Sequence, residues 1–199
     1  MNYDNKRTAG LLFVVGAVQF VLAVVISEAI YSGYSVGQQY LSDLGDWSLA
    51  GNYAAIFDVS VILYGLFIIA GAYFFQRVFK NRLFTSLLVI TGVGSVSAGV
   101  VAINMSFSVH GILGLIAFVS AAASAIMSYK FEKSPLSYVS VILGAVTLLA
   151  LVLLSSGFYL GLGLGGMQRF IIYPISLWSL GFGAHLIGDS SDTATTSKA

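Results

Sequence analysis

The sequence predicts an all-α polytopic membrane protein, a bundle of six transmembrane helices with a long first outer loop. Of the 199 residues, 58% are hydrophobic and only 9% are charged, whereas soluble domains carry about 25% charged residues. Six apolar segments reach or approach the roughly 20 residues that a helix needs to cross a bilayer core of about 30 Å. Inside lipid every backbone polar group must be paired within the chain, so we expect these segments to be helices rather than strands.

The apolar segments fill residues 1–188, which is the length of a single domain. The predicted helices are residues 8–30, 53–75, 84–105, 109–129, 136–157 and 170–188. The sixth is the shortest, and Pro174 lies in its first turns, where the missing N–H matters least. The first exceeds the apolar core of a signal peptide and is followed by no small-residue cleavage site, so we expect it to be retained. The small polar segment 189–199 predicts a disordered cytoplasmic tail.

Lysine and arginine predict the orientation of the helices, because cytoplasmic loops are enriched in both. Eight of the nine basic residues fall on one side of a six-helix topology, and only Arg169 falls on the other. The eight are Lys6, Arg7, Arg77, Lys80, Arg82, Lys130, Lys133 and Lys198. We therefore expect a plasma-membrane protein whose N- and C-termini are both cytoplasmic, with the first loop facing outward.

Composition excludes several kinds of chemistry. The chain has no cysteine, which removes disulfides, thiolate catalysis and cysteine-ligated metals. Its net charge of +1 offers no basic face for nucleic acid. His110 and His185 lie about 22 Å apart in depth at 1.5 Å per helical residue, so they cannot ligate one haem or metal together. We predict no cofactor and no metal site.

The first outer loop contains the stretch YSVGQQYLSDLGDWSLAGN, residues 34–52, which is the longest polar run before the tail. Long loops in compact domains are usually lids or binding elements. Its tyrosines and Trp47 are also typical of an interfacial aromatic belt. We expect the loop to fold back as a lid over the mouth of the bundle.

Polar residues are concentrated near the predicted outer ends of the helices, and the opposite half of the bundle has little comparable. The predicted ligand-binding residues are Glu28, Asp43, Asn52, Asp58, Asn104, His110 and Arg169. A carboxylate at membrane depth is costly unless it is paired or hydrated, and such residues are functional candidates. One arginine cannot neutralise Glu28, Asp58 and Asp43 together, so we expect a hydrated pocket or a ligand at this level.

Two interpretations of these residues remain open. In the first, His110 with Asp58 or Glu28 forms an acid–base pair, and these three residues are the catalytic candidates. In the second, Glu28 or Asp58 simply pairs with Arg169 and joins two helices. No nucleophile can be assigned, so the sequence does not decide whether the protein is an enzyme.

Several motifs resemble those of a known family. The stretch YSVGQQYLSDLG, the pairs Asn52–Tyr53 and Phe57–Asp58, and GMQR before a last helix with Pro174 and Trp178 resemble domain-of-unknown-function family 998. The resemblance implies a six-helix membrane protein and no specific activity. Residues 40–45, YLSDLG, also resemble the first-loop motif of the Frag1/DRAM/Sfk1 family, which implies a link to membrane lipid organisation.

These observations together predict an integral membrane protein with an outward-facing polar pocket that binds or processes a lipid headgroup or a small polar ligand. One alternative is a non-catalytic accessory subunit of a larger membrane complex, and a second is a proton-coupled carrier. The expected partners are membrane lipids, with membrane-protein partners in the subunit alternative and no nucleic acid.

Overall fold

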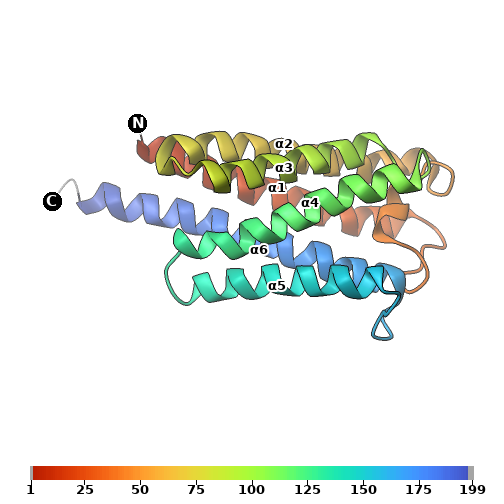
Figure 1. The fold of residues 1–199 in the computed structure, drawn as a ribbon. Helices are drawn as coiled ribbons and strands as arrows, with labels where there is room; N and C mark the ends of the chain where they lie inside the picture. The colour runs from red at the N-terminus through yellow and green to blue at the C-terminus, as the bar shows by residue number, and fades with distance from the viewer. Residues whose placement is uncertain (1, 197–199) are drawn as a thin grey trace.

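The protein consists of six long helices joined by turns and short 3₁₀ segments (Figure 1). The structure, a computed structural model, describes the backbone of residues 2–196 and the side chains of residues 4–189. The helices are α1 (Asn2–Ile30), α2 (Ala54–Phe79), α3 (Arg82–Val100), α4 (Phe107–Met127), α5 (Leu136–Ser155) and α6 (Gly163–Thr196). Six spans within these helices are long and apolar enough to cross a membrane.

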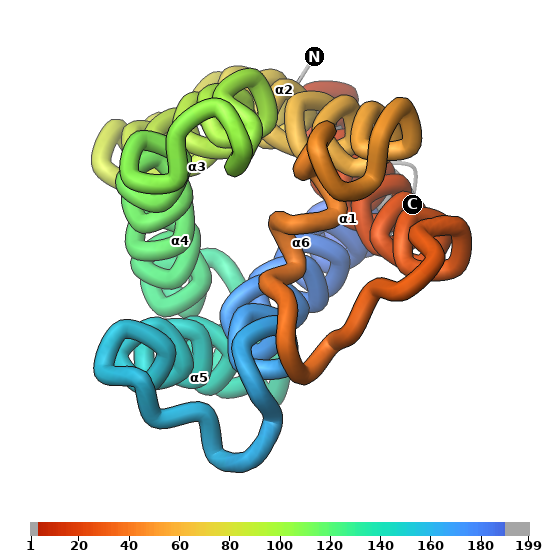
Figure 2. The backbone as a smooth tube through the Cα atoms, turned by 90° about the vertical axis from the view of Figure 1, so that its right-hand side faces the viewer, coloured from red at the N-terminus to blue at the C-terminus, as the bar shows by residue number. Residues whose placement is uncertain are grey.

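The six helices form a closed ring. Each helix packs against its neighbours in the chain, and α6 returns to pack against α1 (Figure 2). Glycines allow some of these helices to approach closely, as small residues do in membrane bundles. A Cβ on Gly65 of α2 would lie 2.5 Å from the carbonyl oxygen of Gly92 in α3, and a Cβ on Gly10 of α1 would lie 2.5 Å from that of Gly183 in α6.

The ring has two different ends. Both termini lie at one end, here called the terminal end, and the connection between α1 and α2, residues 31–53, lies at the other, here called the loop end (Figure 1). We call residues 31–53 loop 1. Of the basic residues whose side chains the structure describes, Arg169 alone lies at the loop end.

Aromatic side chains fill the terminal end of the ring. Phe75 is fully buried, and its ring lies 4.4–6.0 Å from the ring centroids of Phe79, Phe84, Phe131 and Phe182. These rings come from α2, α3, α6 and the turn after α4, so one cluster joins four parts of the chain. Such packing is the main source of stability between membrane helices, because lipid supplies little hydrophobic driving force.

Loop 1 folds back onto the loop end of the ring (Figure 2). Its 3₁₀ segment Leu41–Gly45 inserts Leu41 and Leu44, which are 0% and 1% exposed. The carbonyl oxygens of Val36 and Gly37 accept hydrogen bonds from the backbone N–H groups of Gly166 and Leu164 at 3.1 and 3.2 Å. Loop 1 thereby satisfies N–H groups at the start of α6 that have no partner within the helix.

The structure corrects both boundaries of the sixth helix. Although the sequence predicts that the sixth helix starts at residue 170, α6 begins at Gly163 because loop 1 supplies acceptors for its first N–H groups. It continues to Thr196, through most of the segment predicted to be disordered, and Asp189 at the start of that segment pairs with Lys6. The last three residues lie outside the described part of the chain.

The other boundaries differ by a few residues. Helix α1 begins at Asn2 and α2 ends at Phe79, so both extend beyond the predicted spans at the terminal end. Helix α3 ends at Val100, and Ser106 caps α4 by accepting a hydrogen bond from the backbone N–H of Val109 at 3.4 Å. Asn104 therefore lies in a turn rather than at the end of a helix.

Candidate functional site

A cavity of about 570 Å³ occupies the half of the ring nearer the loop end, here called the loop half, where the aromatic cluster is absent. All six helices and loop 1 contribute to its walls. Along α4 the lining residues run from Phe107 to Ala121. At 1.5 Å per residue this stretch spans about 21 Å, so the cavity runs from the loop end past the middle of a bilayer core of about 30 Å.

The polar and apolar groups of the cavity lie at different depths. Tyr40, Ser42, His110, Tyr159 and Gln168 line it near the loop end, and all five belong to loop 1, to the α5–α6 turn or to the first turns of α4 and α6. Further in, the walls are mainly apolar and aromatic. The cavity is therefore amphipathic along its length, with hydrogen-bonding groups at one end.

Serine and threonine hydroxyls in the deeper wall are occupied by their own helices. Ser95 and Ser176 donate to the carbonyl oxygens of Thr91 and Ile172 at 2.9 and 3.1 Å, and Thr91 donates to Leu87 at 2.9 Å. A hydroxyl that binds the preceding turn in this way satisfies itself without a partner in the cavity. These serines and threonines consequently add little polarity to the deep part of the cavity, and Tyr64 supplies the other hydroxyl there.

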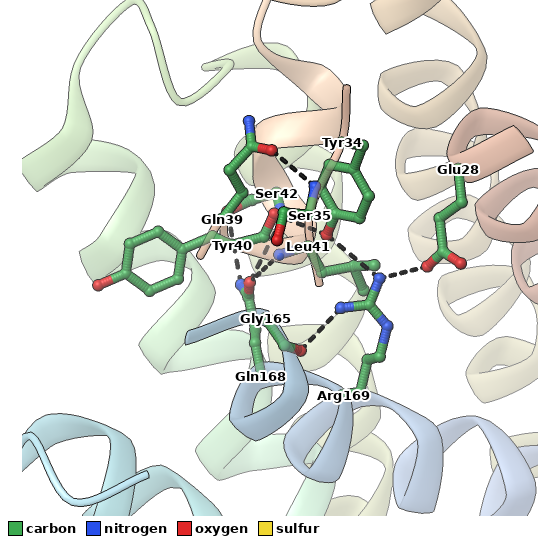
Figure 3. Close-up of polar contacts among 10 residues, drawn as sticks. All are labelled: Glu28, Tyr34, Ser35, Gln39, Tyr40, Leu41, Ser42, Gly165, Gln168 and Arg169. Carbon is green, nitrogen blue, oxygen red and sulfur yellow. Dashed lines mark hydrogen bonds and ion pairs between the residues drawn. The ribbon is translucent and has the colours of Figure 1, made fainter. Parts of the chain in front are cut away.

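Gln168 connects the cavity to loop 1. Its Oε1 accepts the backbone N–H of Leu41 at 2.6 Å and that of Ser42 at 3.4 Å, and its Nε2 donates to Ser42 Oγ at 3.4 Å (Figure 3). The side chain is 9% exposed. A single glutamine on α6 thus satisfies two backbone donors that the insertion of Leu41 removes from water. The sequence analysis did not select Gln168, although it lies in the GMQR motif.

His110 is the one residue of the predicted ligand-binding set that lines the cavity, among the described residues. Its Nδ1 lies 2.8 Å from the carbonyl oxygen of Val101 and 3.1 Å from that of Ala98. Carbonyl oxygens only accept, so Nδ1 carries the proton. In the neutral ring Nε2 is then a hydrogen-bond acceptor.

Arg169 and Glu28 form an ion pair between α6 and α1 (Figure 3). The guanidinium also donates to the Tyr34 hydroxyl at 3.1 Å and to the carbonyl oxygen of Gly165 at 2.8 Å. Tyr34 in turn donates to the carbonyl oxygen of Tyr40 at 3.0 Å. The second interpretation of these residues, an ion pair that joins two helices, is what the structure contains, with loop 1 attached to it.

Asp58 lies beneath loop 1 in α2. Its side chain is 7% exposed, and Oδ2 accepts a hydrogen bond from Trp47 Nε1 at 2.8 Å. A Cβ on Gly45 would lie 2.2 Å from Asp58 Oδ1, so only glycine fits where loop 1 crosses this carboxylate. Asp58 therefore binds loop 1 rather than Arg169.

The remaining predicted residues lie apart from the cavity. Asp43 Oδ2 accepts the backbone N–H of Tyr40 at 2.8 Å, which closes the first turn of the 3₁₀ segment. Burial raises the pKa of Asp43, and the hydrogen bond from the Tyr40 backbone N–H opposes that shift. Asn52 and Asn104 have exposed side chains.

The structure therefore does not bring the three catalytic candidates together. His110 contacts backbone carbonyls, Asp58 contacts Trp47, and Glu28 contacts Arg169. Among the residues whose side chains are described, no group of three or more His, Asp or Glu residues is placed to hold a metal ion. The described geometry is that of a cavity with loop 1 fastened at its loop end.

A second polar cluster lies at the terminal end, where the sequence analysis expected little. Glu132 is 9% exposed, and its Oε2 accepts a hydrogen bond from Ser128 Oγ at 3.0 Å, which also accepts from Trp178 Nε1 at 3.0 Å. His185 Nε2 lies 3.1 Å from the carbonyl oxygen of Phe131. Burial raises the pKa of Glu132, and hydrogen bonds from Ser140 and Ser128 oppose that shift. Glu132 was missed because it follows a helix in a short basic turn.

Six membrane-length apolar helices closed into a ring define an integral membrane protein. The family model for the protein of unknown function DUF998 matches residues 14–185, so the chain belongs to this family and the predicted resemblance is confirmed. No significant match was found among curated proteins or among solved structures. The family carries no specific function, so the function must be argued from the site.

Proposed function

We propose that this chain binds a lipid-like molecule in the cavity of the loop half. The observation that carries the proposal is the cavity itself, about 570 Å³ within a membrane-spanning ring. Sites for one small molecule are usually mostly apolar, with a few placed polar groups and a volume of about 300–1,000 Å³. A site of this kind that opens inside the membrane is suited to a ligand that is itself dissolved in the bilayer.

In this proposal the predicted ligand-binding residues have two roles. His110 contacts the ligand, because it lines the cavity. The ion pair of Glu28 and Arg169 joins α1 to α6. Asp43 and Asp58 hold loop 1 by accepting hydrogen bonds from Tyr40 and Trp47. They are positioning residues, and the ligand they favour is one that fits beneath the fastened loop.

We also propose that the loop end faces outward and that both termini are cytoplasmic. The support is the distribution of charge, since Lys6, Arg7 and the basic residues of the α2–α3 and α4–α5 connections lie at the terminal end. The chain has no cysteine, so Ser48→Cys in exposed loop 1 and Lys133→Cys at the terminal end can be labelled singly in intact cells. A membrane-impermeant maleimide should modify Ser48→Cys alone, and the reverse pattern would contradict the orientation.

A cavity-filling substitution tests the binding role. A Cβ on Gly114 would have Phe118 Cε2, at 3.6 Å, as its nearest neighbour, so Gly114→Leu can enter the cavity without a backbone clash. Gly181→Leu is the matched control, since its Cβ would meet Leu136 at 3.6 Å and Gly181 does not line the cavity. Both proteins would be purified in mild detergent, and co-purified lipids identified by mass spectrometry.

We expect the wild type and Gly181→Leu to carry a bound lipid-like molecule at near-equal occupancy, and Gly114→Leu to lose it while keeping its unfolding temperature. Equal lipid content in all three proteins would contradict the proposal. Recovery of the wild type with a protein partner at fixed stoichiometry and with an empty cavity would support the accessory-subunit alternative instead.

A further inference from the structure

The charge of the cavity wall restricts its ligand. Among the described residues that line the cavity there is no aspartate, glutamate, lysine or arginine. The nearby ions are already engaged, Arg169 with Glu28 and Asp58 with Trp47. A charged headgroup placed in this cavity would lack a counter-ion, and an unpaired charge away from water is strongly disfavoured. A phosphate, carboxylate or ammonium group is therefore a poor fit, whereas a neutral group is not penalised in this way.

The available hydrogen-bonding groups restrict it further. Nδ1 of His110 is fixed as a donor by two carbonyl oxygens, which leaves Nε2 of the neutral ring as an acceptor at the polar end of the cavity. Gln168 Oε1 is occupied by the N–H groups of Leu41 and Ser42. The acceptor on His110 favours a ligand that donates, and the Tyr40 and Tyr159 hydroxyls at the same end can donate or accept. The simplest neutral headgroup that suits both is a hydroxyl, which donates and accepts.

The walls also indicate where a ligand enters. Helices α4 and α5 touch toward the terminal end, where a Cβ on Gly144 would lie 2.7 Å from the carbonyl oxygen of Ala122. Toward the loop end α4 is inclined away from α5 (Figure 1). There Gly111 of α4 and Ser155 of α5 line the cavity, and both residues are exposed.

Direct contacts join several other neighbours in the loop half. A Cβ on Gly99 of α3 would lie 2.9 Å from the carbonyl oxygen of Asp58 in α2, and the Glu28–Arg169 ion pair joins α1 to α6. Loop 1 is fastened to α6 by Gln168 and by the carbonyl oxygens of Val36 and Gly37. At the edge between α4 and α5, residues of both helices line the cavity and are exposed, so this edge can admit a ligand from the surrounding lipid.

Resting on the proposed lipid-binding role, we infer that the ligand is a neutral single-chain lipid with a hydroxyl headgroup, admitted from the bilayer between α4 and α5. Its hydroxyl donates to Nε2 of His110, and its chain lies along the apolar wall toward Ala121. The volume of about 570 Å³ falls in the range that holds one small molecule rather than a whole two-chain phospholipid.

The headgroup is tested with three probes of equal chain length, a fatty alcohol, its methyl ether and the fatty acid at alkaline pH. Each would be titrated into wild-type protein, His110→Ala and Gly114→Leu. We expect the wild type to bind the alcohol roughly three- to tenfold more tightly than the ether, which cannot donate, and to bind the carboxylate most weakly. In His110→Ala the alcohol and ether should bind equally, with the ether affinity little changed.

The outcomes separate the two proposals. If Gly114→Leu blocks all three probes but the wild type does not distinguish alcohol from ether, the headgroup inference fails and the lipid-binding role stands. A preference for alcohol that persists in His110→Ala overturns the role of His110. If no probe is sensitive to Gly114→Leu, the cavity is not the binding site and both proposals fail.

The route is tested by tethering, because the native chain has no cysteine. One pair, Gly111→Cys with Ser155→Cys, spans the α4–α5 edge. The other, Gly37→Cys with Leu164→Cys, joins loop 1 to α6, where Leu164 N–H already donates to the Gly37 carbonyl oxygen at 3.2 Å. Each pair would be closed with a crosslinker that has two thiol-reactive ends. Entry of a brominated fatty alcohol would then be measured by the quenching of a tryptophan introduced as Phe118→Trp.

Closing the α4–α5 pair should slow entry at least tenfold, and closing the loop pair should leave it unchanged. Slowing by the loop pair alone, or by neither pair, overturns the lateral route. The single-cysteine variants treated with the same reagent control for the bulk of the label.

Discussion

The terminal end and the loop end of the ring are built from the same six helices but differ in what fills the interior. At the terminal end Phe75 and the rings around it close the centre, with neighbouring centroids as near as 4.4 Å. At the loop end the centre is a cavity of about 570 Å³, and Tyr40 and Ser42 of loop 1 line part of it. A membrane bundle is held mainly by packing, so the difference indicates that the terminal end stabilises the ring, while the loop end leaves the cavity in which we propose that a ligand binds.

The largest effect that distinguishes the two ends should come from Phe75→Ala. Removing a fully buried ring from a packed cluster costs about 3–5 kcal/mol. Phe118→Ala is the matched variant at the loop half, where the ring lines the cavity and already lacks partner atoms on one side, so we expect a loss of about 1 kcal/mol. Thermal unfolding in detergent measures both, and equal losses would contradict a stability difference between the ends.

An arginine at each end gives the next comparison. Arg169→Leu leaves Glu28 half-buried without its partner and removes the bond to Tyr34, so we expect a loss of about 2–4 kcal/mol and faster proteolysis of loop 1. Arg77→Leu removes an exposed arginine at the terminal end, which donates to Tyr73 at 2.7 Å, and should change stability by less than about 0.5 kcal/mol.

A double variant checks the reason for this difference. Adding Glu28→Gln to Arg169→Leu removes the unpaired carboxylate and should restore part of the lost stability. Losses that simply add would show that the ion pair does not couple α1 to α6.

A smaller effect is expected where loop 1 crosses α6. A Cβ on Gly165 would lie 2.2 Å from the carbonyl oxygen of Gln39 and 2.7 Å from that of Val36, so Gly165→Ala must displace loop 1. We expect a loss of about 1–3 kcal/mol and increased hydrogen exchange at residues 36–41. Gly37→Ala, whose Cβ meets nothing within 4 Å, is the control, and loosening of the loop by both would contradict a specific contact at Gly165.

The sequence predicts the helices well because crossing a bilayer imposes length and hydropathy on each segment independently. It also predicts that Glu28 or Asp58 could pair with Arg169, since depth along a helix follows from residue counting. The start of α6 at Gly163 is different, because it depends on carbonyl oxygens of loop 1 more than 120 residues earlier in the chain. No local pattern encodes such a contact.

The sequence predicts an outward-facing polar pocket, but the apolar depth of the cavity and most of its lining residues were not predicted, for a related reason. Its position depends on the inclination of α4 away from α5, which results from packing around the whole ring. Gln168 and Arg169 are adjacent in the chain but point to different partners, the backbone of loop 1 and Glu28. Residue type marked the arginine as a candidate, whereas the uncharged Gln168 gave no comparable signal.

The smallest predicted effect returns to the terminal end and depends on pH. Burial raises the pKa of Glu132, so the folded state favours the protonated carboxyl. The stabilisation from that proton is complete below the ordinary pKa of glutamate, about 4.3, and is lost as the pH rises through the raised value in the folded protein. Glu132→Gln keeps an acceptor for Ser128 Oγ without the charge. At pH 8 it should therefore unfold at a higher temperature than the wild type, by the few degrees that about 1 kcal/mol produces, with the difference vanishing near pH 4. The control is Asp4→Asn, which replaces an exposed acid at the same end and should show no such crossover. If Glu132→Gln were less stable than the wild type at pH 8, the charged carboxylate would be the form that stabilises the terminal end.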